Sequence, residues 1–175
     1  MRPRLLPMVA VSALLTSCGA GTTAAVPAAA TANCRAADLT WTLTLLTAEG
    51  TTAPDPANAE LAAVNSGTRP CALAGYPKLE FHRGKGPQAR GSGEGGLAAV
   101  TLGADRAAVF ALRWPGTDGK GPGGTCTPRV TTATATVAAP GEAAAVRVPV
   151  TDRSGKPAEA TVCGPEVRMS PPATR

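Results

Sequence analysis

Apolar and polar residues alternate strictly across residues 38–46, DLTWTLTLL, and no other feature of the chain constrains its fold as strongly. Leu39, Trp41, Leu43 and Leu45 share one side of an extended chain, and three threonines occupy the other side. A period of two residues with β-branched side chains on the polar side predicts a half-buried β-strand. A helix would scatter the same apolar residues around its circumference.

Further short segments of this kind follow, separated by turns rich in glycine and proline. They are AELAAVN, YPKLEFHR, LAAVTLG, AAVFALRW, RVTTATATVAA, AAAVRVPV and ATVCGPEVRM. The polar sequence GADR predicts a hairpin, and the glycine-rich residues 83–96 and 115–124 are predicted to be exposed loops. Only ANAELAAVN, rich in alanine, would also tolerate a helix. About eight short strands predict an all-β fold, specifically an antiparallel, immunoglobulin-like β-sandwich.

The first eighteen residues have the pattern of an export signal. Arg2 and Arg4 precede an apolar run, Leu5 to Leu15, which is shorter than the roughly 20 residues of a membrane-spanning helix. The sequence Leu15-Thr16-Ser17-Cys18 resembles a bacterial lipobox. The resemblance implies that Cys18 becomes a diacylated N-terminus, which anchors the protein stably on the extracytoplasmic face of the cell membrane. The alternative is ordinary cleavage and secretion, with Cys18 left as a thiol or in a disulfide.

The number of cysteines is consistent with this interpretation, because setting Cys18 aside leaves four of the five. In an exported chain, four cysteines predict a framework of two disulfides, with three possible connectivities. Sequential pairing is favoured because each loop then encloses 36 residues and would stabilise the fold by about 4 kcal/mol. The two expected pairs are Cys34 with Cys71 and Cys126 with Cys163. No metal or cofactor is predicted, because the chain has no C-x-x-C motif and only one histidine.

Composition divides the chain into four parts. They are a signal peptide (1–17), a flexible Ala/Thr/Gly tether (18–33), a single β-sandwich domain (34–170) and a C-terminal tail (171–175). Removing Arg2 and Arg4 from the 17 basic side chains leaves 15 against 12 acidic ones. This excess is too small to predict nucleic-acid binding.

The positive excess of the mature chain lies within residues 78–113. We therefore expect the contact surface in the basic loop 83–96, at Arg83, Lys85 and Arg90. Its long-range attraction would suit anionic lipid or wall polymer, and an ordinary solvated surface is the alternative.

The chain lacks a recognisable catalytic pattern. His82 would be the base of a triad, and Ser92 and Asp105 are near it in sequence, but there is no G-x-S-x-G elbow. The acidic residues are spread singly, without the arrangement of a glycosidase. We therefore expect a non-catalytic binding module whose partner is a protein, a wall polymer or a small ligand. An envelope-modifying hydrolase and a passive structural lipoprotein are the alternatives.

Residues 61–77, LAAVNSGTRPCALAGYP, contain an L-x-x-x-N-x-G turn, a cysteine and a G-Y-P. Together with VTLGADRAAVFALRW, CTPRV and a final cysteine downstream, this pattern resembles the actinobacterial lipoprotein family called domain of unknown function 4232. The resemblance covers roughly residues 34–168 and departs from the usual Pro-Gly turn at Gly103-Ala104-Asp105. The family has no established activity, so the resemblance implies export, a sandwich-like fold and the disulfides, and no site. From the residues themselves, Asn65 and Gly67 suit a tight turn, and Tyr76 is expected in the core or at a corner.

Overall fold

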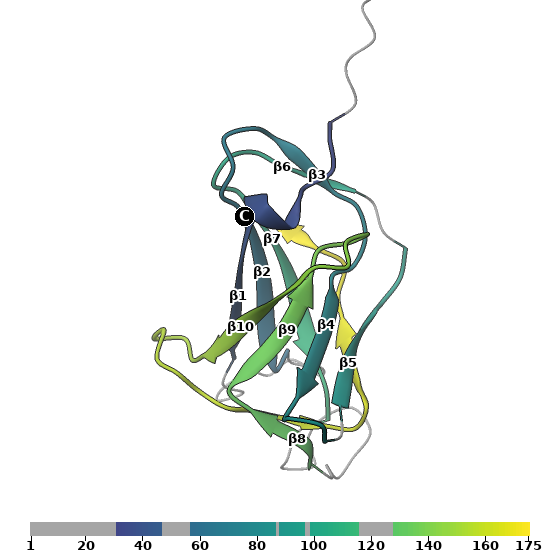
Figure 1. Ribbon diagram of the computed structural model, residues 1–175, viewed down its shortest axis with the longest axis vertical. Coiled ribbons are helices and arrows are strands. Elements are labelled where there is room, and N and C mark those ends of the chain that lie inside the picture. The colour runs from purple at the N-terminus through teal and green to yellow at the C-terminus, as the bar shows by residue number, and fades with distance from the viewer. Residues whose placement is uncertain (1–30, 47–56, 87, 97–98, 116–127) are drawn as a thin grey trace, which may run out of the picture.

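The structure is a computed structural model and describes residues 31–46, 57–86, 88–96, 99–115 and 128–175 (Figure 1). These residues form thirteen strands and one short 3-10 helix, Ala36–Asp38. The strands are β1 (Leu39–Leu45), β2 (Ala59–Asn65), β3 (Cys71–Leu73), β4 (Lys78–His82), β5 (Gln88–Gly93), β6 (Val100–Leu102), β7 (Ala107–Arg113), β8 (Pro128–Thr132), β9 (Thr134–Ala138), β10 (Ala145–Thr151), β11 (Ala160–Cys163), β12 (Glu166–Met169) and β13 (Ala173–Thr174). No helix in these ranges is long and apolar enough to span a membrane.

Eight strands pair into a sheet that closes on itself in a barrel-like arrangement. Their order is β12-β5-β4-β9-β10-β1-β2-β7, and β7 pairs again with β12. All of these pairings are antiparallel except β1–β10 and β12–β5, which are parallel. Two small sheets, β3-β6 and β8-β11, lie at opposite ends of the barrel (Figure 1). The prediction of an all-β chain is confirmed, and the finer assignment of an immunoglobulin-like sandwich stays a prediction.

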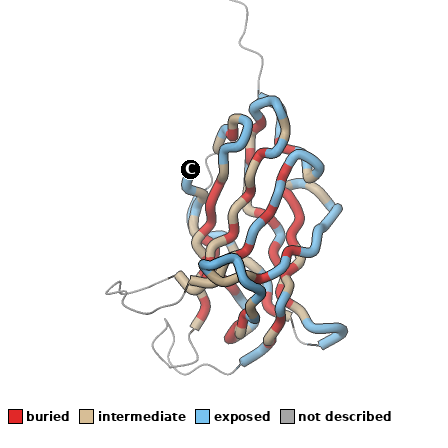
Figure 2. The backbone as a smooth tube through the Cα atoms, turned by 90° about the vertical axis from the view of Figure 1, so that its left-hand side faces the viewer, coloured by how far each residue is buried: buried red, intermediate tan, exposed pale blue. Residues whose placement is uncertain are grey.

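Alternate side chains of the strands fill one core, as the buried positions in Figure 2 show. In β1, Leu39, Trp41 and Leu43 are buried and the intervening threonines are exposed, so the predicted alternation is confirmed. Phe81 of β4 meets the ring of Trp114 edge-on, with 5.9 Å between the ring centroids. An edge-on pair of rings of this kind stabilises the core beyond the apolar area that it buries.

The predicted hairpin across GADR is wrong. β6 pairs with β3, and β7 pairs with β2, although the turn between β6 and β7 does form. The reason is Asn65 at the end of β2. Its backbone N–H donates to the carbonyl of Arg106 (2.9 Å), and its carbonyl accepts from the N–H of Asp105 (2.8 Å). The turn is therefore bound to β2, and its two strands diverge to different partners.

Four other boundaries differ from the sequence-based predictions. Residues 88–93 of the predicted loop 83–96 form β5, and RVTTATATVAA is divided between β8 and β9. The predicted tail contains β13, which pairs with β7, so residues 171–175 belong to the domain. At the other end, residues 32 and 33 of the predicted tether already pair with Ala72 of β3. Most of the glycine-rich loop 115–124 lies outside the described residues.

Tyr76 explains why a glycine-rich segment forms a strand. Its ring lies over Gly93 of β5, and its hydroxyl donates a hydrogen bond to the carbonyl of Glu94. The ring also lies 6.2 Å from that of Phe110, centroid to centroid. A Cβ at position 93 would stand only 2.0 Å from a ring carbon of Tyr76. The glycine therefore makes room for an aromatic ring, and the prediction of a core or corner tyrosine is confirmed.

Replacing Gly93 with alanine is expected to lower the free energy of unfolding by about 2 kcal/mol, because the new methyl group overpacks the Tyr76 ring. Urea unfolding measures the loss. Gly96→Ala is the matched control: nothing lies within 4 Å of its Cβ position, so a change below about 0.5 kcal/mol is expected. Equal stability of the two variants would contradict the contact.

Candidate functional site

The barrel has two distinct ends. The chain enters the domain at the end that contains β3, where Ala32 and Asn33 pair with Ala72. β4 runs away from this end, so that His82, the turn after it and the start of β5 lie at the opposite end together with β8 (Figure 1). Below, these are called the N-terminal end and the distal end of the barrel.

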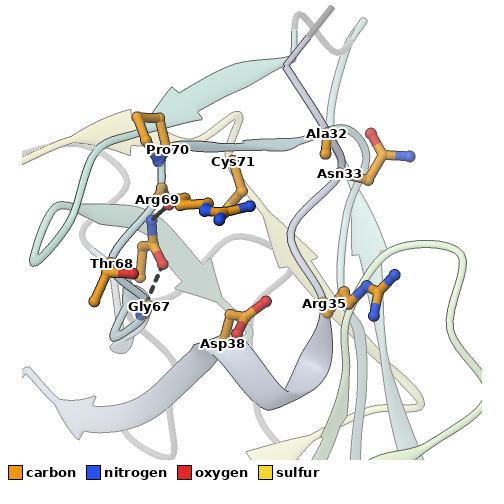
Figure 3. A pocket seen from close by; sticks show the side chains of 10 residues that line it. Ala32, Asn33, Arg35, Asp38, Gly67, Thr68, Arg69, Pro70 and Cys71 are labelled. Atoms are coloured by element: carbon orange, nitrogen blue, oxygen red, sulfur yellow. Dashed lines mark hydrogen bonds between the residues drawn. The ribbon is translucent and has the colours of Figure 1, made fainter.

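A pocket of about 240 Å³ opens at the N-terminal end. Asn65 closes its base: the side-chain amide donates to the carbonyls of Arg69 (2.9 Å) and Leu102 (3.0 Å) and accepts from the N–H of Gly67 (3.0 Å). Figure 3 shows the bonds to Arg69 and Gly67. Both N–H donors of this amide are used and its side chain is fully buried, which makes it a structural group.

The charged side chains on this pocket and its adjoining turns balance in sign. The three basic residues are Arg35, Arg69 and Arg106, and the three acidic ones are Asp38, Asp105 and Glu142. These residues therefore give the N-terminal end no net positive charge that would attract an anion.

The outer face of β5, β4, β9 and β10, unlike the N-terminal pocket, carries a row of polar and charged side chains. The strand registers place Arg90, Glu80, Thr136 and Arg147 in one row across the four strands. In the neighbouring row toward the distal end, Gln88 stands opposite His82. These polar side chains come from segments far apart in the sequence, and only the strand order brings them onto one surface.

Two arginines line a pocket of about 350 Å³ on this face. Arg83 follows β4, and Arg147 projects from β10; both are exposed. His82 and Thr134 line the same pocket. The Nδ1 atom of His82 is buried and has no hydrogen-bond partner among the described residues. The pocket thus presents two guanidinium groups and a hydroxyl, which are potential donors to an anion.

Two more arginines line an adjacent pocket of about 380 Å³, beyond the His82–Gln88 pair. Arg90 forms an ion pair with Glu80 (Nε–Oε1, 3.4 Å) and donates from Nη2 to Gln88 Oε1 (3.1 Å). Arg129 of β8 donates from Nε to the carbonyl of Gln88 (2.8 Å). The four residues Arg83, Arg90, Arg129 and Arg147 are called the arginine surface below.

The structure divides the predicted contact residues. Arg83 and Lys85 lie in the turn between β4 and β5, whereas Arg90 is on β5 itself, so the three do not form one loop. Sequence reasoning missed Arg129 and Arg147. Alternation around Val148 and Val150, both buried, indicates that Arg147 points outward. Its position beside Arg83 depends on the strand order.

The cysteines follow the predicted pattern as far as the structure describes them. Cys34 and Cys71 form a disulfide, which confirms that pairing. Cys163 is also disulfide-bonded, and Cys126, its predicted partner, lies outside the described residues. Cys18, the predicted lipidation site, lies outside them as well.

The residues considered for a catalytic triad are not brought together. His82 ends β4 at the distal end, whereas Asp105 follows β6 and is bonded to Asn65 at the N-terminal end. Ser92 lies on β5, beyond the row that contains Arg90.

These features define an all-β, disulfide-linked domain with a closed sheet and a basic outer face. A family model for a domain of unknown function (DUF4232) matches residues 34–172, and the chain belongs to this family. No curated protein and no solved structure matches the chain. The family resemblance expected from residues 61–77 is thereby confirmed, while its lipoprotein character stays a prediction.

Proposed function

We propose that this protein is a lipid-anchored, non-catalytic binding module on the extracytoplasmic face of the cell membrane. The observation that carries the binding role is the arginine surface, where four guanidinium groups from three separate segments flank two pockets. Two of its arginines, Arg83 in the turn after β4 and Arg129 of β8, lie at the distal end, which a domain tethered through its N-terminus would present away from the membrane.

Two features of the chain support export and anchoring. The run from Arg2 to Cys18 has the order of an export signal followed by a lipobox-like sequence. The Cys34–Cys71 disulfide is a bond that persists in oxidising compartments outside the cytoplasm. In this proposal residues 18–31 form the tether between the acylated cysteine and the first paired residues of the domain.

The same proposal describes the domain as an immunoglobulin-like sandwich. The two parallel joints divide the closed sheet into two antiparallel runs of four strands, β1-β2-β7-β12 and β5-β4-β9-β10. Each run would be one sheet of the sandwich, and the arginine surface extends from the outer face of the second run to its distal end. The joined edges leave no long unpaired strand beside that surface.

The Cys18→Ala variant is expected to move from the membrane fraction to the medium, because it removes the acylated side chain. Fractionation of cells that produce the tagged chain measures the shift, and the intact mass of the extracted protein tests for a diacylglyceryl group on Cys18. Ser17→Ala keeps a small residue before the cysteine and is expected to leave the protein in the membrane fraction. A Cys18→Ala chain that still sediments with membranes would contradict the anchor.

A further inference from the structure

The guanidinium groups of Arg83 and Arg147 are available to an anion from outside the chain. Both are exposed, and neither forms an ion pair with a described residue. They line one pocket together with Thr134 and with His82, whose buried Nδ1 has no hydrogen-bond partner among the described residues. Guanidinium groups match oxyanions through paired N–H donors, so the pocket fits an oxyanion better than a neutral group.

The other two arginines, Arg90 and Arg129, are held in place by contacts within the domain. Glu80 and the Gln88 side chain fix Arg90, and the Gln88 carbonyl fixes Arg129. The Glu80–Arg90 pair is largely exposed and therefore weak, so it orients the guanidinium group more than it neutralises it. Glu166 stands beside Arg90 on β12. Counting Glu80 and Glu166 against the four arginines still leaves an excess of two positive charges.

The spacing of the two pairs selects a repeating ligand. Arg90 and Arg147 stand in one row, three strand spacings apart, or about 14 Å. A single phosphate or carboxylate is too small to touch both pockets, whereas a linear polymer with one anion per repeat reaches them together. We propose that the arginine surface binds a linear phosphodiester polymer of the cell envelope, with one phosphate of the polymer in each of the two pockets.

This assignment deepens the proposed function and rests on it for the choice between polymer and lipid. A chain anchored at Cys18 has the balanced N-terminal end of its barrel toward the bilayer. The turn after β4, which carries Arg83, and strand β8, which carries Arg129, lie at the other end (Figure 1). Anionic headgroups of the same membrane then face the N-terminal end of the domain. A polymer that extends outward from the membrane reaches the distal end, where Arg83 and Arg129 lie. Phosphodiesters carry one charge per repeat, which matches a surface whose excess charge is small.

The test is a binding titration with the purified Cys18→Ala chain, which has no acylation site at position 18, and poly(glycerol phosphate) as the probe. Binding is expected to weaken as salt rises, since each phosphate contact releases a counterion. The R83Q/R147Q variant is expected to bind about tenfold more weakly or worse, because it removes two charged donors. Urea unfolding of both proteins verifies that the substitutions leave the fold intact.

The R35Q/R69Q variant is the matched control, because it removes the same charge from the N-terminal end. It is expected to bind the polymer within about twofold of the unsubstituted chain. Equal losses in the two double variants would overturn the site. Vesicles of phosphatidylglycerol or chains of hyaluronate that bind as tightly as the polymer would overturn the phosphodiester assignment. The titration is independent of acylation, so a failed anchor and a failed ligand give different results.

Discussion

Replacing Asn65 with aspartate is expected to lower the free energy of unfolding by about 4 kcal/mol. The side chain is fully buried, and its amide nitrogen donates to two carbonyls while its oxygen accepts from a backbone N–H. Aspartate has nearly the same shape but directs a second oxygen at the carbonyls of Arg69 and Leu102. Both hydrogen bonds are lost, and a buried charge faces two acceptors. Urea unfolding at neutral pH measures the loss as a shift in midpoint.

The control for this variant is Ser66→Ala at the next position. The Ser66 hydroxyl is exposed and donates to the carbonyl of Asp38 (3.1 Å), so its loss is expected to cost less than about 1 kcal/mol. Burial raises the pKa of the new carboxyl in Asn65→Asp, and its protonated form donates one of the two lost bonds. Stability should therefore recover partly as the pH falls through that raised pKa. An Asn65→Asp protein as stable as Ser66→Ala would refute the role of the amide.

Much of the fold follows from local sequence because burial in strands has a period of two. The alternation in 38–46 gives β1 and its buried face correctly, and ATVCGPEVRM contains both β11 and β12, which Gly164 and Pro165 separate. In RVTTATATVAA the break is less visible. It falls at Ala133 because the Thr132 hydroxyl bonds to both the N–H and the carbonyl of Thr134. A local side-chain bond of this kind leaves no signal in hydrophobic alternation.

Strand partners are set by contacts that sequence patterns do not contain. GADR forms a turn, yet Asn65 from β2 holds that turn and separates its strands. Gly91 and Gly93 indicate a loop by composition, but they leave room for Met169 and Tyr76 against β5. Without the packing partner, a glycine that accommodates a ring cannot be distinguished from one that loosens a loop.

The candidate site could be predicted only in part for the same reason. Arg83 and Arg90 stand close together in a basic stretch, so the sequence indicates them as contact residues. Arg129 and Arg147 join them because β8 packs near the start of β5 and β9 lies between β4 and β10. The sequence therefore predicts a basic loop, whereas the strand order produces a two-pocket surface.

Removing the disulfide with the double variant Cys34→Ala/Cys71→Ala is expected to lower the free energy of unfolding by about 4 kcal/mol. The bond joins residues 37 apart in sequence and restricts the unfolded chain over that span. In the native state it fixes the segment before β1 to β3, beside the hydrogen bonds of Cys34 and Ala72. The unfolded variant is less compact, so its urea dependence should also be steeper.

Reduction of the unsubstituted protein separates this bond from the one at Cys163. A reductant opens both disulfides, so the reduced protein should unfold at a lower urea concentration than the oxidised double variant. The reductant should also destabilise the double variant further, since the bond at Cys163 is still present in it. An oxidised double variant that unfolds at the same urea concentration as the oxidised unsubstituted protein would contradict the stabilising role of Cys34–Cys71. The N-terminal end of the barrel would then be held by its hydrogen bonds, among them those of Asn65 and β3, without a contribution from the disulfide.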